Sequence, residues 1–142
     1  MGGVLFVTWD GGGNLPPALG VAAELRGRGL EARFLGHAAQ RAAIEAAGFR
    51  FTAYAHGRPW SSAEPATGAA ALERISSVFT DPGAGIDLLE TARREPPAMT
   101  VIDCLSLGAL HAAQQARLAH IGLAHTYLHY LRHALAAARR AG

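Results

Sequence analysis

The chain of 142 residues contains a single cysteine, Cys104, and lacks any apolar run long enough to cross a membrane. One cysteine cannot build an internal disulfide framework, and such chains are typical of reducing compartments. A membrane-spanning helix needs about 20 consecutive apolar residues. No basic region precedes the short apolar run at residues 4–7, so the N-terminus does not resemble a signal peptide. We therefore expect a cytoplasmic protein without a membrane span.

Charged residues are also few, at 17% of the chain, and they nearly balance to a formal net charge of +2. The arginines are scattered along the sequence, whereas nucleic-acid binding calls for a basic patch or stripe. Half of the residues are hydrophobic, which is typical of a globular chain. A domain of this size buries roughly 70% of its unfolded surface, so it can fold without a metal or a disulfide. We expect one domain, with no nucleic-acid partner and no metal.

Short apolar runs alternate with helical segments along the chain. Buried apolar runs bounded by turn residues predict strands, and glycine or proline marks where the helices between them begin and end. The predicted strands are residues 4–8, 31–35, 49–54, 99–103 and 120–124. The predicted helices are residues 16–28, 38–47, 68–78, 86–94, 107–117 and 127–140. This alternation predicts an α/β fold, with a Rossmann-like parallel sheet and helices on both faces.

Two polar residues follow the first and fourth predicted strands. Asn14 lies in the glycine-rich turn after residues 4–8, and Asp103 ends the strand at residues 99–103. Such sheets bind ligands beyond the carboxyl ends of their strands, where the strand order reverses. If the order is 3-2-1-4-5, Asn14 and Asp103 face each other across that crevice.

The glycine-rich turn does not match the common phosphate-binding motifs. Gly11 and Gly13 fit the start of a dinucleotide fingerprint, but Pro16 occupies the place of its third glycine. Gly36-His37 stands where an acidic ribose partner would be expected, and no Gly-Lys-Ser/Thr follows the turn. Nicotinamide, flavin and P-loop chemistry are therefore disfavoured, and we expect no bound cofactor.

Three segments resemble the N-terminal half of family-one glycosyltransferases, particularly the bacterial enzymes that decorate macrolides and other natural products. The first is the opening Val-Leu-Phe-Val-Thr-Trp with the turn Asn-Leu-Pro-Pro at residues 14–17. The second, residues 22–36, resembles the family's first helix and its turn into the second strand. The third is residues 99–124, and its first part resembles the family's fourth strand and the helix that follows. The likeness is weak between residues 55 and 95.

The resemblance implies one half of a GT-B fold, with residues 1–142 as the acceptor-binding N-terminal domain and the donor-binding C-terminal domain absent. The complete enzyme would transfer a sugar from a nucleotide sugar, its co-substrate, to a small hydroxylated natural product with inversion. The chain alone is then expected to be inactive. The alternative is a non-catalytic small-molecule-binding or accessory module derived from such an enzyme.

The resemblance also implies two catalytic positions. In the family, a histidine in the glycine turn takes the proton of the acceptor hydroxyl, and an aspartate on the fourth strand orients it. Asp103 matches the aspartate, but Asn14 occupies the histidine position, and an amide is not a useful base. Three explanations for this asparagine remain open. The acceptor hydroxyl is acidic enough to need little help, a different residue (Asp10, Asp103 or His56) is the base, or the protein does not catalyse transfer. Helix capping is the structural alternative for both Asn14 and Asp103.

Acceptor binding is expected from residues of the loops around the glycine turn. These are Trp9, Asp10, Gly13, His56, Trp60 and Phe79, with core packing as the alternative for both Trp9 and Trp60. His125, His129 and His133 follow a helical spacing, which could suit a metal but fits a partly exposed helix face better. The last predicted helix and the fifth strand would leave apolar surface and a sheet edge, which favours a homodimer.

Overall fold

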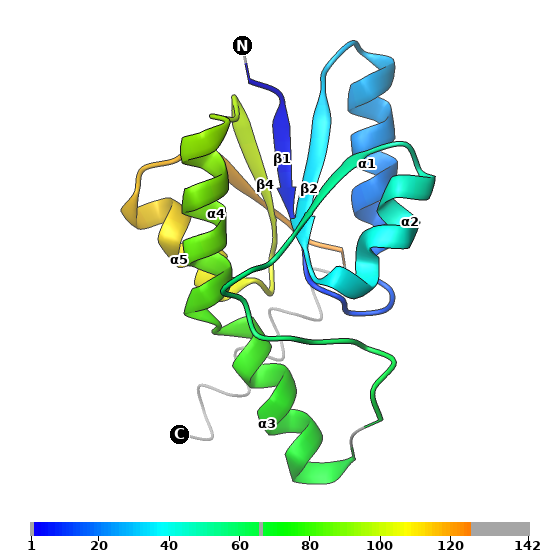
Figure 1. Ribbon diagram of the computed structural model, residues 1–142, viewed down its shortest axis with the longest axis vertical. Coiled ribbons are helices and arrows are strands. Elements are labelled where there is room, and N and C mark those ends of the chain that lie inside the picture. Colours follow the sequence, from blue (N-terminus) through cyan, green and yellow to red (C-terminus); the bar gives the residue numbers. More distant parts are fainter. Residues whose placement is uncertain (1, 66, 126–142) are drawn as a thin grey trace.

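The computed structural model describes residues 2–65 and 67–125 and contains one five-stranded parallel sheet (Figure 1). Its strand order is β3-β2-β1-β4-β5, which confirms the predicted order. The strands are β1 Val4–Val7, β2 Ala32–Gly36, β3 Arg50–Ala53, β4 Met99–Asp103 and β5 His120–Leu123. Because the order reverses between β1 and β4, the crevice expected at a switch point lies at the carboxyl ends of these two strands.

Helices cover both faces of the sheet, as predicted (Figure 1). They are α1 Leu15–Gly27, η1 Ala38–Gln40, α2 Arg41–Ala46, α3 Gly68–Phe79, α4 Pro82–Arg94 and α5 Leu107–Gln115. One apolar core joins α1 and α2 to the sheet through Phe6, Phe34 and Ile44. A second core joins α4 and α5 to the other face through Leu35 and Leu88. The single helix predicted at residues 38–47 begins as a 3-10 turn.

The element boundaries follow from glycine, proline and one acidic cap. Gly29 and Gly48 adopt φ of +80° and +83° directly after α1 and α2, a backbone conformation that favours glycine. Prolines occupy the first turns of α1 and α4, where their missing N–H costs no helix bond. Asp81 caps α4 by accepting the Gly83 N–H at 2.9 Å. Local residue chemistry thus determines where these helices begin and end.

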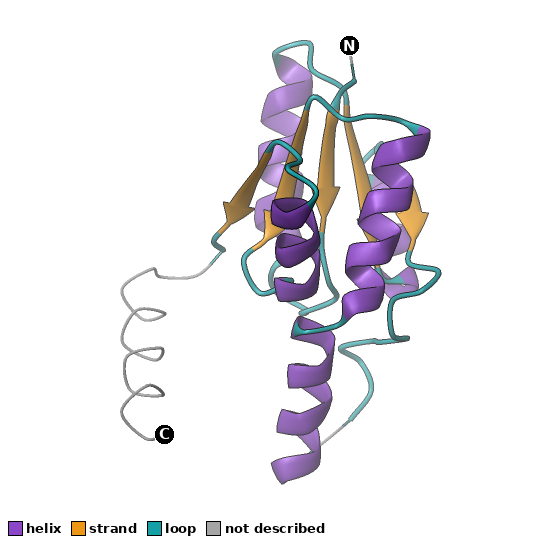
Figure 2. Ribbon diagram, turned by 90° about the vertical axis from the view of Figure 1, so that its left-hand side faces the viewer, coloured by secondary structure: helices purple, strands orange, loops and turns teal. Residues whose placement is uncertain are grey.

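The helix α3 lies apart from the two layers. Figures 1 and 2 show it projecting beyond the carboxyl ends of the strands, after the long loop that leaves β3. Its first ten residues contribute nothing to the buried core, and Leu72 is 68% exposed, whereas Val78 near its end is buried. The loop at residues 54–65 and the end of α3 therefore lie near the carboxyl ends of the strands.

Two further expectations concern the membrane and the C-terminal part of the chain. None of the helices in the described residues is both long and apolar enough to cross a membrane. β5 is an edge of the described sheet, and its Ile121 is 53% exposed. The predicted helix at residues 127–140, with His129 and His133 and the homodimer argued from it, lies outside the described residues.

Candidate functional site

Asn14 is the centre of the loop that follows β1. Its Nδ2 donates to the Trp9 carbonyl at 2.9 Å and to Asp103 Oδ2 at 2.8 Å, and its Oδ1 accepts the Gly11 N–H at 3.0 Å. The residue is only 3% exposed. A buried amide with its donor and acceptor groups bonded holds its surroundings in one arrangement. Asn14 therefore fixes the glycine turn to the carboxyl end of β4.

Asp103 receives bonds on both of its oxygens. Besides the Asn14 amide on Oδ2, Oδ1 accepts the backbone N–H of Leu105 at 2.9 Å. The residue is 4% exposed. A buried carboxylate is tolerated when donors surround it, and here they also set its orientation. The expectation that Asn14 and Asp103 meet across the crevice is confirmed as geometry, while their catalytic roles stay predictions.

Helix capping does not account for either side chain. Asn14 occupies the N-cap position of α1, yet its side chain makes no capping hydrogen bond. Ser106, not Asp103, is the N-cap residue of α5. The two polar groups are instead bonded to each other, Asn14 from the loop after β1 and Asp103 from the end of β4.

His125 joins this pair, and the sequence interpretation missed it. Its Nε2 lies 3.2 Å from both carboxylate oxygens of Asp103. The side chain is 14% exposed and follows the end of β5 without belonging to a described helix. For His125 the interpretation as part of an exposed helix face was therefore wrong. The usable signal was its position two residues beyond a strand that neighbours β4.

Asp10 fastens the long loop to the glycine turn. Its carboxylate accepts the Ser62 N–H at 2.8 Å and the Ser62 hydroxyl at 3.0 Å, and its carbonyl accepts the Trp60 indole N–H at 2.6 Å. Both carboxylate oxygens are thus already bonded. Asp10 shapes the site by placing Trp60 over the turn, and Gly13 lies exposed on that turn.

Three of the expected acceptor-binding residues form one aromatic cluster. Trp9 packs edge-on against Phe79 with ring centroids 4.9 Å apart, and Trp60 lies 6.3 Å from Trp9. Trp9 is 6% exposed, and its indole N–H has no acceptor among the described residues. Trp9 is therefore core to this cluster, whereas Trp60 and Phe79 remain partly accessible. The cluster provides an apolar surface beside the Asn14–Asp103 pair.

Trp60 also lines a cavity of about 400 Å³ beyond the ends of β2 and β3. Among its other lining residues are His37, Tyr54 and Arg58. Burial lowers the pKa of His37, and the nearby Asp10 carboxylate opposes this shift. Burial likewise raises the pKa of Tyr54, so its hydroxyl stays protonated. The cavity therefore offers an aromatic wall and neutral hydrogen-bonding groups, with Arg58 and Glu64 as charged groups of opposite sign, which suits a small ring compound with a few polar substituents.

His56, another expected acceptor-binding residue, is held by α4. Its Nδ1 lies 2.8 Å from Asp87 Oδ1, and the same buried carboxylate accepts the backbone N–H groups of Ala55, His56 and Gly57. Asp87 belongs to α4, and α4 packs on the face of the sheet opposite to α1. His56 therefore lies on the opposite face of the sheet from α1 and Asn14. Asp87, which the sequence interpretation also missed, thus holds the loop after β3 against α4 by hydrogen bonds.

The hydrogen bond between His56 and Asp87 should make a pH-dependent contribution to the stability of the fold. The hydrogen bond to Asp87 raises the pKa of His56, with Glu90 adding to the effect and Arg94 opposing it. A histidine whose pKa is higher in the folded than in the unfolded chain stabilises the fold fully below the unfolded pKa of about 6.5. That stabilisation is lost as the pH rises through the higher pKa of the folded state. Urea unfolding should therefore show wild type losing stability from pH 6 to pH 8 relative to His56→Gln. Parallel pH profiles of the two proteins would contradict this.

One donor set near the site meets the distance requirement for a metal. Ligand atoms of Asp103, Cys104 and His125 all lie within 4.8 Å of one another. However, burial raises the pKa of the Cys104 thiol, with the Asp103 carboxylate adding to the shift, so the thiolate is disfavoured. The Asp103 oxygens already accept bonds from Asn14 and Leu105. We assign no metal to these residues.

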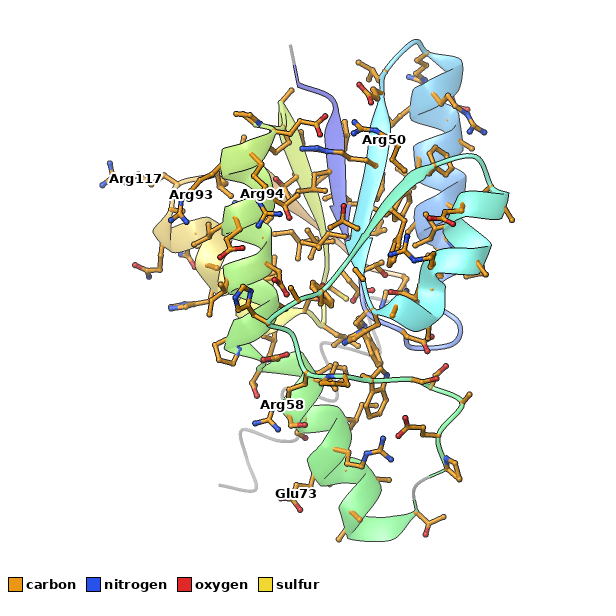
Figure 3. The ribbon with its side chains drawn as sticks, in the orientation of Figure 1. Arg50, Arg58, Glu73, Arg93, Arg94 and Arg117 are labelled. Atoms are coloured by element: carbon orange, nitrogen blue, oxygen red, sulfur yellow. The ribbon has the colours of Figure 1, made fainter. Side chains whose placement is uncertain are left out.

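Charged side chains are distributed over several elements. Figure 3 labels Arg50 on β3, Arg93 and Arg94 on α4 and Arg117 after α5. Arg50 and Arg94 line one small cavity beside Glu95, whereas Arg117 lies apart from Arg50. Arg50 is paired with Glu31 at 2.6 Å and with Glu95 at 2.7 Å. The labelled arginines thus do not gather into one stripe.

Comparisons with known proteins identify the fold. No protein-family model matches the chain, and no curated protein matches it in sequence. Its structure resembles the glycosyltransferase of kitacinnamycin (TM-score 0.70, 21% identity, 96% of this chain and 34% of that one). It also resembles the glycosyltransferase SnogD from Streptomyces nogalater, with a TM-score of 0.63 and 24% identity over 87% of this chain and 33% of that one. VinC in complex with dTDP matches with a TM-score of 0.61 and 20% identity over 82% of this chain and 33% of that one. The chain therefore has a fold found in glycosyltransferases and spans about a third of their length.

Proposed function

We propose that this chain is the acceptor-binding N-terminal half of an inverting glycosyltransferase. The complete protein would transfer a sugar from a nucleotide sugar to a small hydroxylated natural product. The observation that carries the proposal is the 2.8 Å bond between Asn14 and Asp103 at the switch point between β1 and β4. Ligands of open parallel sheets bind at this place.

The surroundings of that bond fit an acceptor better than a nucleotide. Trp60 and Phe79 offer partly accessible aromatic faces, and the 400 Å³ cavity is lined by uncharged aromatic groups as well as by Arg58 and Glu64. Aromatic walls with a few polar groups suit a ring-containing aglycone. The glycine turn, in contrast, lacks the phosphate-binding spacing. A donor-binding C-terminal domain as partner, a cytoplasmic setting and a homodimer belong to the same proposal.

An accessory binding module is the second candidate. Asn14 favours it, because a primary amide cannot take the proton of an acceptor hydroxyl. Both candidates require that the chain binds a hydroxylated ring compound, but only the first requires a glycoside product. Incubating the natural full-length protein with dTDP-glucose and a bound acceptor separates them. A bound acceptor without any glycoside would favour the accessory module.

Binding can be measured on the two tryptophans of the site. We expect the planar polyphenols quercetin and alizarin to quench tryptophan fluorescence with a Kd of roughly 1–100 µM. Trp60→Leu should weaken binding about tenfold, since it removes a ring that is worth about 1.4 kcal/mol in such contacts. Leu72→Ala, which truncates an exposed apolar side chain of α3, is the matched control. Equal affinity in wild type and Trp60→Leu would contradict the assigned wall.

Calorimetry with nucleotide sugars separates the acceptor from the donor. Because the proposed donor site belongs to a second domain, residues 1–142 should not bind UDP-glucose or dTDP-glucose tightly in calorimetry. A micromolar Kd for either nucleotide sugar would contradict the assignment of this half to the acceptor.

A further inference from the structure

His125 and Asp103 form a histidine–carboxylate pair next to Asn14. The ring nitrogen Nε2 lies 3.2 Å from both oxygens of the carboxylate. Both side chains are mostly buried, at 14% and 4% exposure. Such a pair orients the imidazole and stabilises its protonated form, which is the arrangement a general base needs.

The sheet itself brings the two residues together. Asp103 pairs with Leu123 in the register of β4 and β5. Val101 precedes Asp103 by two residues in β4, and both Val101 and Leu123 pack in the core beneath α1, so Asp103 lies on this face. His125, two residues after Leu123, contacts Asp103 there. Asn14, at the start of α1, approaches Asp103 from that face as well. Three elements that are distant in sequence therefore converge on one carboxylate.

The remaining bonds of Asp103 leave little freedom in the pair. Asn14 donates to Oδ2 and the Leu105 N–H donates to Oδ1, so the carboxylate cannot rotate without losing both bonds. A fixed carboxylate in turn favours the tautomer of His125 with its proton on Nε2. The lone pair then resides on Nδ1, which none of the described residues contacts within hydrogen-bond distance. Asn14 is thus a positioning residue that acts through Asp103.

The other candidate bases are less suited to this crevice. His56 is paired with Asp87 on the opposite face of the sheet. Both oxygens of Asp10 already accept bonds from Ser62. His37 Nδ1 accepts the Asp10 N–H at 3.1 Å, and the residue is 5% exposed. Among these histidines and carboxylates of the described residues, His125 alone combines contact with Asp103 and partial exposure.

We propose that His125 is the general base of the sugar transfer, an inference that rests on the proposed function. Nδ1 takes the proton of the acceptor hydroxyl while that oxygen forms a bond to the anomeric carbon. The bond from this carbon to the nucleoside diphosphate breaks, and the diphosphate leaves with the electron pair. Asp103 stabilises the imidazolium that results. Asn14 thereby keeps a role, although it cannot act as a base.

The first test needs no turnover. Long-range ¹H–¹⁵N correlation spectra of the labelled protein, at a pH where the ring is neutral, should assign the His125 proton to Nε2. Asp103→Asn should reduce that preference, and His125→Gln identifies the resonance. A neutral His125 with its proton on Nδ1 would overturn the inference, because that nitrogen could not accept another.

The second test measures transfer by the full-length protein from dTDP-glucose to quercetin or alizarin. His125→Gln should lower kcat by about 10²–10⁴, the usual contribution of a general base, with KM changed only a few-fold. Added imidazole should partly restore His125→Ala, which a merely structural role would not allow. His111→Gln, the same change at an exposed position of α5, is the matched control.

The outcomes separate this inference from the proposed function. Full activity in His125→Gln, with strong loss in Asp103→Asn, would overturn His125 as the base and leave the glycosyltransferase standing. Acceptor binding without turnover in wild type would favour the accessory module and overturn both. Loss of kcat in His125→Gln with imidazole rescue of His125→Ala supports both.

Discussion

Asn14→Asp is expected to lower the free energy of unfolding by about 2–4 kcal/mol at pH 8, one of the largest single-residue effects in the chain. The substitution keeps the size of the side chain but replaces the Nδ2 donor with an oxygen. That oxygen would lie close to Asp103 Oδ2, where the amide now makes a 2.8 Å bond. Both residues are at least 96% buried. Two carboxylates at this distance cannot both be ionised without a large penalty.

The loss should depend on pH in a defined direction. In the folded variant the two carboxyl groups share a proton, whereas the aspartates of the unfolded chain, with a pKa of about 3.9, have already released theirs between pH 5 and pH 8. The folded state therefore binds more protons than the unfolded state, so stability falls as pH rises. Urea unfolding at pH 5, 6, 7 and 8 should show Asn14→Asp approaching wild type at the acid end.

The swapped double variant is the control. In Asn14→Asp/Asp103→Asn, one carboxylate again faces one amide, and most of the lost stability should return at pH 8. If the double variant is no more stable than Asn14→Asp, the penalty does not come from two facing carboxylates. A pH-independent loss in the single variant would lead to the same conclusion.

The fold could be predicted because its signals are local. The strand at residues 99–103 is a short apolar run that ends in an acid, and the structure places β4 at these residues. Gly29 and Gly48 end helices by their positive φ, and this preference depends on the glycine itself. The boundaries that shifted include the 3-10 start of the helix at residues 38–47, where Gln40 Nε2 donates to the Thr8 hydroxyl and the Trp9 carbonyl, contacts between residues about 30 positions apart.

The site could be predicted only in part, because most of it depends on contacts between distant residues. Asn14 and Asp103 were found from the ends of two neighbouring strands. His125 was judged by its spacing to other histidines, and that spacing is not what places it. Its contact with Asp103 joins residues 22 positions apart and requires the register of β4 with β5. The same holds for Asp87, which bonds a loop about 30 residues earlier in the chain.

Gly108→Ala should destabilise the chain by about 3 kcal/mol, because α4 and α5 meet through glycines without room for a side chain. A Cβ on Gly108 would lie 2.0 Å from the carbonyl oxygen of Asp81. Asp81 cannot easily retreat, since its carboxylate accepts the N–H groups of Gly83 and Arg58. At Gly85 on the facing helix, a Cβ would likewise come within 2.9 Å of the Gly108 carbonyl oxygen.

Gly20→Ala is the matched control for this prediction. Gly20 lies inside α1 and is exposed, and a Cβ there would meet no atom within 4 Å. Alanine should therefore stabilise α1 by about 0.5–1 kcal/mol through helix propensity alone. Thermal unfolding should move in opposite directions, with Tm falling by about 10 °C in Gly108→Ala and rising by a few degrees in Gly20→Ala, at about 3 °C per kcal/mol. A Gly108→Ala protein as stable as wild type would mean that α4 and α5 can separate freely, and the close packing at Asp81 would then not be a constraint on the fold.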